Sequence, residues 1–179
     1  MSREELLNEL EEIRSLLDLG LSTEVKARLT PLISAARHDA SLLAQARCVL
    51  SAALEMQGHY RESLEAVQMY ELPESRAKLD ADAIACLRVQ IGLVYNYTGD
   101  QPKAIALLNA ALREEGENGS HAHLGAIYAA MARVYRNISE FTIARDHSQK
   151  ALNNYRETGD WRGLAEAYFG LALTDVFEG

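Results

Sequence analysis

The chain has 179 residues, of which 48% are hydrophobic and 25% are charged. These fractions match those of ordinary globular domains and exclude intrinsic disorder, so we expect a single domain over residues 1–179. The formal net charge of −8 would repel a nucleic-acid backbone, so we expect no nucleic-acid partner.

The elements predicted along the chain are all helices. Three prolines and 11 glycines leave little room for a turn-rich β fold, and abundant Ala and Leu favour helix. Apolar residues recur at helical spacing and predict nine helices, over about 3–19, 22–37, 40–57, 60–70, 76–98, 101–115, 121–137, 141–157 and 161–177. The first residues resemble no signal peptide and no run is long enough to span a membrane, so we expect a cytoplasmic protein without membrane contact.

The segment around residues 84–112 shows how two of these helices are joined. One apolar stripe runs through Ile84, Leu87 and Ile91, and a second begins at Ala104. Between them, residues 98–102 read Thr-Gly-Asp-Gln-Pro. A glycine suits a left-handed helix end, an aspartate caps the next helix, and a proline fits its first turn. The pattern predicts a helix, a tight turn and a helix.

This helical hairpin repeats along the chain. When the sequence is aligned with itself so that Tyr95 matches Tyr135, similar residues coincide at many other positions. Aligning Gly58 with Gly99 also matches Ser51 with Gly92. The pairs at the same separation as Tyr95 and Tyr135 include Ala104 with Ala144, Ala111 with Ala151, Tyr128 with Tyr168 and Ala132 with Ala172. Small residues at matched positions predict close approach of paired helices, and no hairpin can bury its apolar stripe alone, so neighbouring hairpins must stack.

The repeated residues resemble the tetratricopeptide repeat (TPR). A small residue, an aromatic three positions later, a Gly-Asp turn and then an alanine carry the resemblance, at Gly92, Tyr95, Gly99, Asp100 and Ala104. A later repeat keeps the pattern, although Ser139 replaces the turn glycine, and the first two repeats are weaker. The resemblance implies an all-α, right-handed α-α superhelix of about four helical hairpins plus one extra helix.

The repeat is longer than the TPR average. The usual repeat has about 34 residues, whereas this one has 40 to 41. Such long repeats resemble those of bacterial signalling and regulatory proteins and of kinesin light chain. Gly179 falls one full repeat after Ser139, where a turn belongs, so we expect a fragment of a longer protein. The alternative is a natural end covered by self-association.

Few residues are candidates for catalysis or metal binding. Cys48 and Cys86 have no metal-ligand spacing and no disulfide framework, so we expect small apolar side chains in a reducing cytosol. His121 and His123 form an H-x-H pair at a helix entry without a supporting set of carboxylate or cysteine ligands, which predicts solvated loop histidines and no metal site. Phosphate-binding loops, CxxC, HExxH and nucleophile-elbow motifs do not occur, so we expect no cofactor and no enzymatic activity.

In the TPR family, the first helices of the hairpins line a concave groove. The resemblance places Asn96, Tyr97, Arg133, Arg136 and Asn137 there as partner-binding residues. The arginines, one helical turn apart, can bind a carboxylate, and the asparagines can hydrogen-bond a peptide backbone. Alternatively, the arginines pair with local acids such as Glu140 or face water. The carboxylate clamp of chaperone-binding members is not matched, because Val89, Leu93 and Ala129 stand where polar residues would be needed.

The resemblance therefore predicts a non-catalytic scaffold that binds a protein or peptide. It would serve as the interaction or regulatory module of a larger multidomain protein, such as a bacterial signalling protein. The alternative is a structural solenoid that self-assembles into homo-oligomers through its exposed ends.

Overall fold

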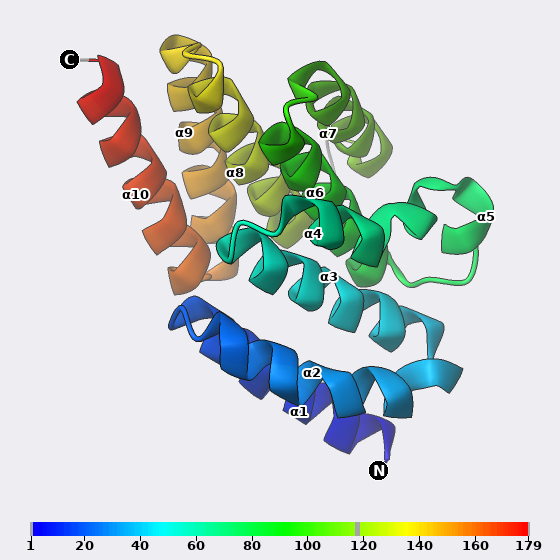
Figure 1. Ribbon diagram of the computed structural model, residues 1–179. Coiled ribbons are helices and arrows are strands. Elements are labelled where there is room, and N and C mark those ends of the chain that lie inside the picture. Colours follow the sequence, from blue (N-terminus) through cyan, green and yellow to red (C-terminus); the bar gives the residue numbers. More distant parts are fainter. Residues whose placement is uncertain (1, 117–118, 179) are drawn as a thin grey trace. The chain divides into compact units, whose positions relative to one another are not determined.

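The computed structural model describes residues 2–116 and 119–178, and these residues form helices joined by short turns, without a strand among them (Figure 1). The helices are α1 (Arg3–Asp18), α2 (Ser22–Ala35), α3 (Ala40–Met56), α4 (Tyr60–Val67), α5 (Pro73–Arg76), α6 (Ala81–Thr98), α7 (Gln101–Glu115), α8 (His121–Asn137), α9 (Phe141–Thr158) and α10 (Trp161–Glu178). Short 3₁₀ helices, η1 (Ala36–His38) and η2 (Gln68–Glu71), follow α2 and α4. The prediction of an all-α fold is confirmed.

Packing divides the chain into two compact units, Met1–Val94 and Tyr95–Gly179, called the N-terminal and C-terminal units below. The N-terminal unit holds α1 to α5 and most of α6, whereas the C-terminal unit holds the last turn of α6 and helices α7 to α10. The single solenoid domain over residues 1–179 stays a prediction. The fifth turn predicted at Gly179 lies outside the described residues.

Most predicted helix bounds hold to within two residues, but two predictions are wrong. The predicted helix over 76–98 is broken: α5 is a single turn, and α6 begins only at Ala81. Asp80 makes this break, because its backbone N–H donates to Ser41 Oγ at 2.8 Å and its Oδ1 accepts the Ala83 N–H at 2.9 Å. A helix cannot run through a residue that caps the next one. The predicted helix over 60–70 ends as α-helix at Val67 and continues as η2.

The turns inside the hairpins share one backbone conformation. Gly20, Gly58 and Gly99 have φ of 78°, 77° and 92°, in the left-handed region that suits glycine. Ser139, at the matched position of the next hairpin, has φ of 63° and is the one non-glycine with positive φ in the described part of the chain. The turn position thus keeps its conformation where the glycine is lost. The predicted cap is also confirmed, since Asp100 Oδ1 accepts the Lys103 N–H at 3.1 Å.

In the N-terminal unit, α1, α2 and α3 pack in succession and α1 also contacts α3. Their core is built from leucine, isoleucine and valine, with Ile13, Val25 and Leu29 fully buried. Between α3 and α4 the close approach uses serines: Ser51 Oγ donates to the Ser63 carbonyl at 3.0 Å, and Ser63 Oγ donates to the Ser51 carbonyl at 2.8 Å. Because each serine is small and its hydroxyl donates to the backbone carbonyl of the other helix, the two helices can pack closely.

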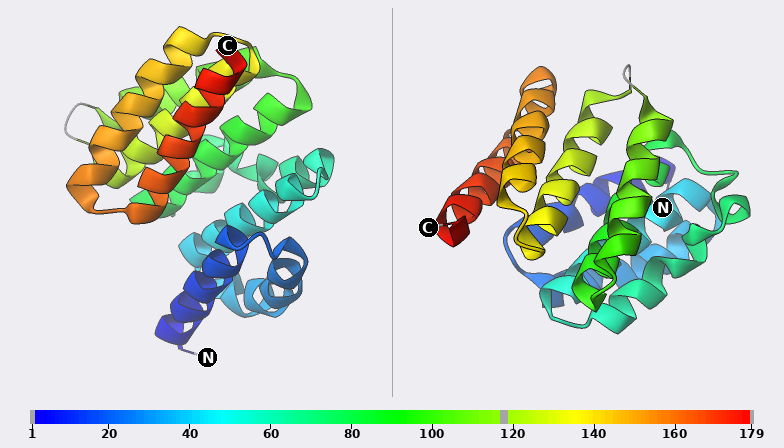
Figure 2. Two further views of the ribbon diagram at one scale, coloured as in Figure 1. Left: turned by 90° about the vertical axis from the view of Figure 1, so that its left-hand side faces the viewer. Right: turned by 90° about the horizontal axis from the view of Figure 1, so that it is seen from above.

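In the C-terminal unit, α9 packs against both α8 and α10, and α8 and α10 also touch each other. Both views of Figure 2 show α10 running alongside α9. The small residues predicted for close approach, Ala132 and Ala144, are 3% and 0% exposed. The buried Tyr155 ring lies against two glycines: a Cβ on Gly125 of α8 or Gly163 of α10 would come within 2.7 Å or 2.5 Å of it. Glycines thus let α8 and α10 close on the same tyrosine.

Candidate functional site

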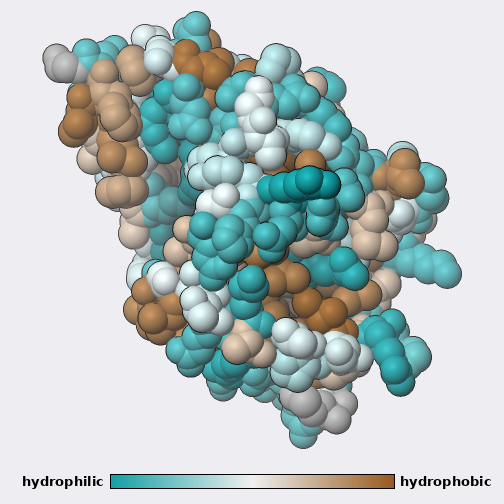
Figure 3. Space-filling view, in the orientation of Figure 1, coloured by the Kyte–Doolittle hydropathy of each residue, from teal (hydrophilic) through white to brown (hydrophobic). Residues whose placement is uncertain are grey.

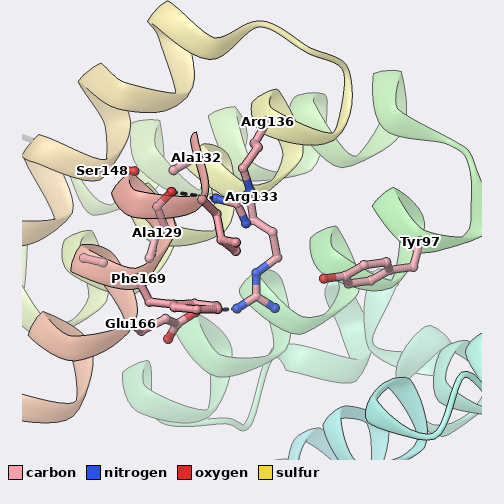
Figure 4. A pocket seen from close by; sticks show the side chains of 11 residues that line it. Tyr97, Ala129, Ala132, Arg133, Arg136, Ser148, Glu166 and Phe169 are labelled. Carbon is pink, nitrogen blue, oxygen red and sulfur yellow. Dashed lines mark hydrogen bonds and ion pairs between the residues drawn. The ribbon is translucent and has the colours of Figure 1, made fainter. Parts of the chain in front are cut away.

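A cavity of about 210 Å³ lies in the C-terminal unit, mainly between α8 and α10 (Figure 4). The end of α6 contributes Tyr97 and α9 contributes Ser148. Small side chains on α8, at Ala129 and Ala132, leave the space open. The full lining is Tyr97, Ala129, Ala132, Arg133, Arg136, Ser148, Glu166, Ala167, Phe169, Gly170 and Leu173. Three of the five predicted partner-binding residues, Tyr97, Arg133 and Arg136, therefore meet at one cavity.

Arg133 spans the cavity to the neighbouring helix. One of its Nη atoms forms an ion pair with Glu166 Oε1 of α10, and the Arg133 side chain is 27% exposed against 51% for Glu166. The sequence offers the alternative that the arginines pair with a local acid such as Glu140. An acid does pair with Arg133, but it comes from α10, 33 residues along the chain. This ion pair helps to hold α10 against α8.

Arg136 is the less compensated of the two cations. Its Nη1 donates to the Gly170 carbonyl at 3.3 Å, and the described residues place no carboxylate in ion-pair contact with it. Burial, and next the positive charge of Arg133, lower the pKa of the Arg136 guanidinium, which nevertheless stays charged at neutral pH. A half-buried cation beside a second cation gains free energy when an anion binds.

The aromatic residues flank this charged centre. Figure 4 shows the Tyr97 hydroxyl pointing toward the Arg133 guanidinium, with the Phe169 ring on the other side of that group. Phe169 is 64% exposed, so an apolar surface stands at the edge of the cavity. Beside the ion pair of Arg133 and Glu166, the arrangement offers the Arg136 cation, a phenol and a ring, which suits an anionic group carried on a partly apolar molecule.

The two asparagines predicted for the same groove lie elsewhere. Asn96 is only 3% exposed, and neither its Oδ1 nor its Nδ2 has a hydrogen-bond partner within residues 2–116 and 119–178. This burial disagrees with the prediction that Asn96 reaches a peptide backbone from a groove. Asn137, the last residue of α8, is exposed but does not line the cavity. Helical spacing does not determine which side of a helix its neighbours will cover.

Glu166 and Phe169 are cavity residues that the sequence did not indicate. Both come from α10, whose apolar stripe suggested only packing. Ala126 is the counterpart of Glu166 in the preceding repeat, so the repeat carried no hint of a carboxylate there. Only the packing of α10 on α8 brings it to Arg133.

The histidines are placed differently from the prediction. His121 Nδ1 lies 2.8 Å from Asn154 Oδ1, and His123 Nδ1 lies 3.0 Å from Glu115 Oε1. The side chains of His123 and Glu115 are 13% and 17% exposed, so His123 is a largely covered helix residue with a carboxylate partner, and the prediction of a solvated loop histidine is wrong for it. In the part of the chain that the structure describes, no three His, Cys, Asp or Glu side chains lie together where they could hold a metal ion.

Comparison of the chain with models of known protein families and with curated proteins finds no match. Among the helices of the described residues, none combines the length and apolar character needed to cross a membrane.

Proposed function

We propose that the chain is a TPR-type, right-handed solenoid and a non-catalytic scaffold that binds a protein or peptide. The proposal rests on the repeated hairpins, the shared turn conformation and the small residues buried at matched positions. Stacked hairpins provide extended surfaces for partners, and their specificity lies in the side chains that those surfaces carry. Such a scaffold would act as the interaction or regulatory module of a larger, multidomain protein, such as a bacterial signalling protein.

The binding group that the site favours is a carboxylate, supplied by the C-terminus or an acidic side chain of the partner peptide. The observation that carries this is the half-buried guanidinium of Arg136, which lines the cavity and lacks a carboxylate partner in the described chain. A carboxylate there would form charge-assisted hydrogen bonds with Arg136 and gain from the field of Arg133. Tyr97 and Phe169 would contact the adjoining apolar part of the peptide.

An array of peptides with either a free or an amidated C-terminus tests the carboxylate proposal. Three forms of the chain are applied to the array: the wild type, Arg136→Met, and Arg113→Met as the matched control. Arg113 is a suitable control because it is exposed on α7 and does not line the cavity. Loss of a hydrogen-bonded charge pair costs about 1.5–3 kcal/mol. We therefore expect Arg136→Met to lower the affinity for carboxylate-bearing peptides by roughly 10- to 100-fold. Arg113→Met should bind as the wild type does.

Arg136→Met leaves the ion pair between Arg133 and Glu166 in place, so the far-ultraviolet circular dichroism should not change. Equal binding of wild type and Arg136→Met, with helicity retained, would refute the assignment of this cavity. Equal binding of peptides that differ only in having or lacking a carboxylate would refute the ligand class.

A second candidate function, self-assembly, is favoured by the exposed face of α10. Trp161, Tyr168, Phe169, Val176 and Phe177 are between 52% and 73% exposed, and Figure 3 shows hydrophobic side chains gathered over the region that α10 occupies. Large apolar patches on a surface mark contacts with other molecules. The repeat agrees: Ala132 of α8 is 3% exposed and the Tyr128 ring stacks on His147 of α9, but their counterparts Tyr168 and Ala172 are exposed.

Light scattering coupled to size exclusion, over a range of concentrations, tests the assembly role. We expect the wild-type chain to form dimers or larger species, and the double variant Tyr168→Glu with Phe177→Glu to elute as a monomer. Neither residue lines the cavity. A wild type that stays monomeric at high concentration would remove this candidate and leave the peptide-binding function untouched.

A further inference from the structure

The two cysteines of the chain, Cys48 on α3 and Cys86 on α6, lie together in the N-terminal unit. Contacts on either side fix the register of their helices. Before them, the Asp80 N–H donates to Ser41 Oγ at 2.8 Å. After them, Gln90 Nε2 donates to Ser51 Oγ at 3.2 Å and to Glu55 Oε2 at 3.0 Å. The helices therefore run parallel, and the cysteines occupy the facing positions between these contacts.

The two thiols interact in this register, because each shifts the pKa of the other, and both cysteines are free. Cys48 is 2% exposed, and Cys86 is partly exposed. A pair of interacting thiols is more than the two separate apolar side chains that the sequence predicted.

The pKa values of the two thiols shift in opposite directions, although the cation Arg14 acts on both. The interaction with Cys48, and further the guanidinium of Arg14 on α1, lower the pKa of the Cys86 thiol, whereas burial raises the pKa of the Cys48 thiol. Arg14 is held toward α3 by its Nη2, which donates to Gln45 Oε1 at 3.0 Å. A thiolate is the reactive form of cysteine, and cations favour it. Cys86 is thus the nucleophile of the pair and Cys48 the resolving thiol.

We propose that Cys48 and Cys86 form a reversible disulfide in response to hydrogen peroxide, which makes the pair an oxidative modification site linking α3 to α6. In the first step the Cys86 thiolate attacks one peroxide oxygen, the O–O bond breaks, and the departing hydroxide takes up a proton to become water. In the second step the Cys48 sulfur attacks the Cys86 sulfenic sulfur. The S–S bond forms, the S–O bond breaks, and the hydroxide leaves as water with the Cys48 proton. Two electrons pass from the sulfurs to the peroxide.

The test uses the whole reduced chain, incubated with hydrogen peroxide in native buffer and then alkylated in denaturant. We expect both thiols to disappear together, the intact mass to fall by two hydrogens, and one cross-linked peptide to contain Cys48 and Cys86. Dithiothreitol should restore both thiols. In Cys48→Ala, dimedone should trap Cys86 as a sulfenic acid, while in Cys86→Ala the Cys48 thiol should survive.

Further measurements distinguish a specific oxidation site from nonspecific oxidation of the two thiols. Arg14→Gln should slow disulfide formation several-fold, while Arg61→Gln, whose side chain is 93% exposed on α4 in the wild type, should not change it. The bond closes the loop from Cys48 to Cys86 and should raise the melting temperature of the oxidised chain by roughly 10 °C. Thiols that resist peroxide, or that oxidise singly or only between chains, would overturn the proposal.

Discussion

At the scale of single residues, the backbone of Ser139 shows what the repeat imposes. The turn inside each hairpin needs a left-handed residue, and Ser139 occupies that conformation with φ of 63° although it carries a Cβ. A left-handed conformation costs an ordinary residue about 1–2 kcal/mol, while glycine adopts it freely but loses more entropy on folding. The backbone of Ser139 is therefore strained, and the surrounding hairpin holds it in this conformation.

We expect Ser139→Gly to stabilise the C-terminal unit by about 0.5–1 kcal/mol, the difference between the strain relieved and the entropy lost. The matched control is Gly99→Ala, where φ is 92° and the added Cβ should destabilise by more than about 1 kcal/mol. Urea unfolding monitored by circular dichroism measures both changes. A destabilised Ser139→Gly would show that the serine side chain, not the φ angle, matters at this turn.

His147 of α9 is a second residue whose environment has a measurable consequence. Its ring stacks between Tyr128 and Tyr135, with ring centroids 5.8 Å and 5.3 Å away, and its buried Nδ1 has no hydrogen-bond partner in the described chain. Burial, and next the charge of Lys150, lower the pKa of His147 below its usual value of 6.5. The neutral ring is therefore the form that fits between the tyrosines.

Because the folded pKa of His147 is lowered, the unfolded chain binds more protons just below pH 6.5 and the free energy of unfolding falls as pH falls through that range. We expect His147→Phe to remove this part of the pH dependence while keeping an aromatic ring between Tyr128 and Tyr135. Unfolding curves from about pH 7.5 to about pH 5 compare the slopes. An identical slope in His147→Phe would show that other groups cause the pH dependence.

At the scale of elements, the attachment of α10 to α9 depends on a glycine. A Cβ at Gly163 would lie 2.5 Å from the ring of Tyr155, which is only 5% exposed and cannot move aside. Farther along α10, a Cβ at Gly170 would meet Arg136 Nη1 at 3.4 Å and Ser148 Oγ at 3.9 Å, which leaves it room. The two glycines share a helix but differ in what surrounds them.

We expect Gly163→Ala to destabilise the C-terminal unit by about 1–3 kcal/mol, the usual cost of overpacking, despite the better helix propensity of alanine. Gly170→Ala is the control, with a neutral or slightly stabilising effect. Tyr155→Leu should lessen the effect of Gly163→Ala in a double-mutant cycle, because the ring atoms that clash are gone. Additive changes would show that Gly163 and Tyr155 do not oppose each other.

At the scale of the whole molecule, net charge and the apolar face of α10 act against each other. Each chain carries −8, so two copies repel, whereas the exposed aromatic residues of α10 favour association. We expect the dissociation constant of the self-associated form to fall several-fold between low salt and roughly 0.5 M salt, where the Debye length is only a few ångströms. Sedimentation equilibrium measures this, and weaker association at high salt would point to ion pairs as the contact.

The sequence by itself determined the helices, their turns and the small residues between paired helices. These features are local or periodic: apolar spacing, caps such as Asp100 and the left-handed turn position can be recognised within one hairpin and checked against the next. Even the replacement of glycine by Ser139 was visible, because the repeat marks the position. The family resemblance adds an expected superhelix, which stays a prediction.

Only the tertiary structure decided which side chains meet. It paired Arg133 with Glu166, placed Cys48 beside Cys86, buried Asn96 and interrupted a predicted helix at Asp80. The physical reason is that these contacts join residues on different helices, and they depend on the rotation and register with which each helix packs. Helical periodicity identifies an apolar stripe, but it does not say which polar or sulfur-containing side chain at the edge of that stripe will face a partner.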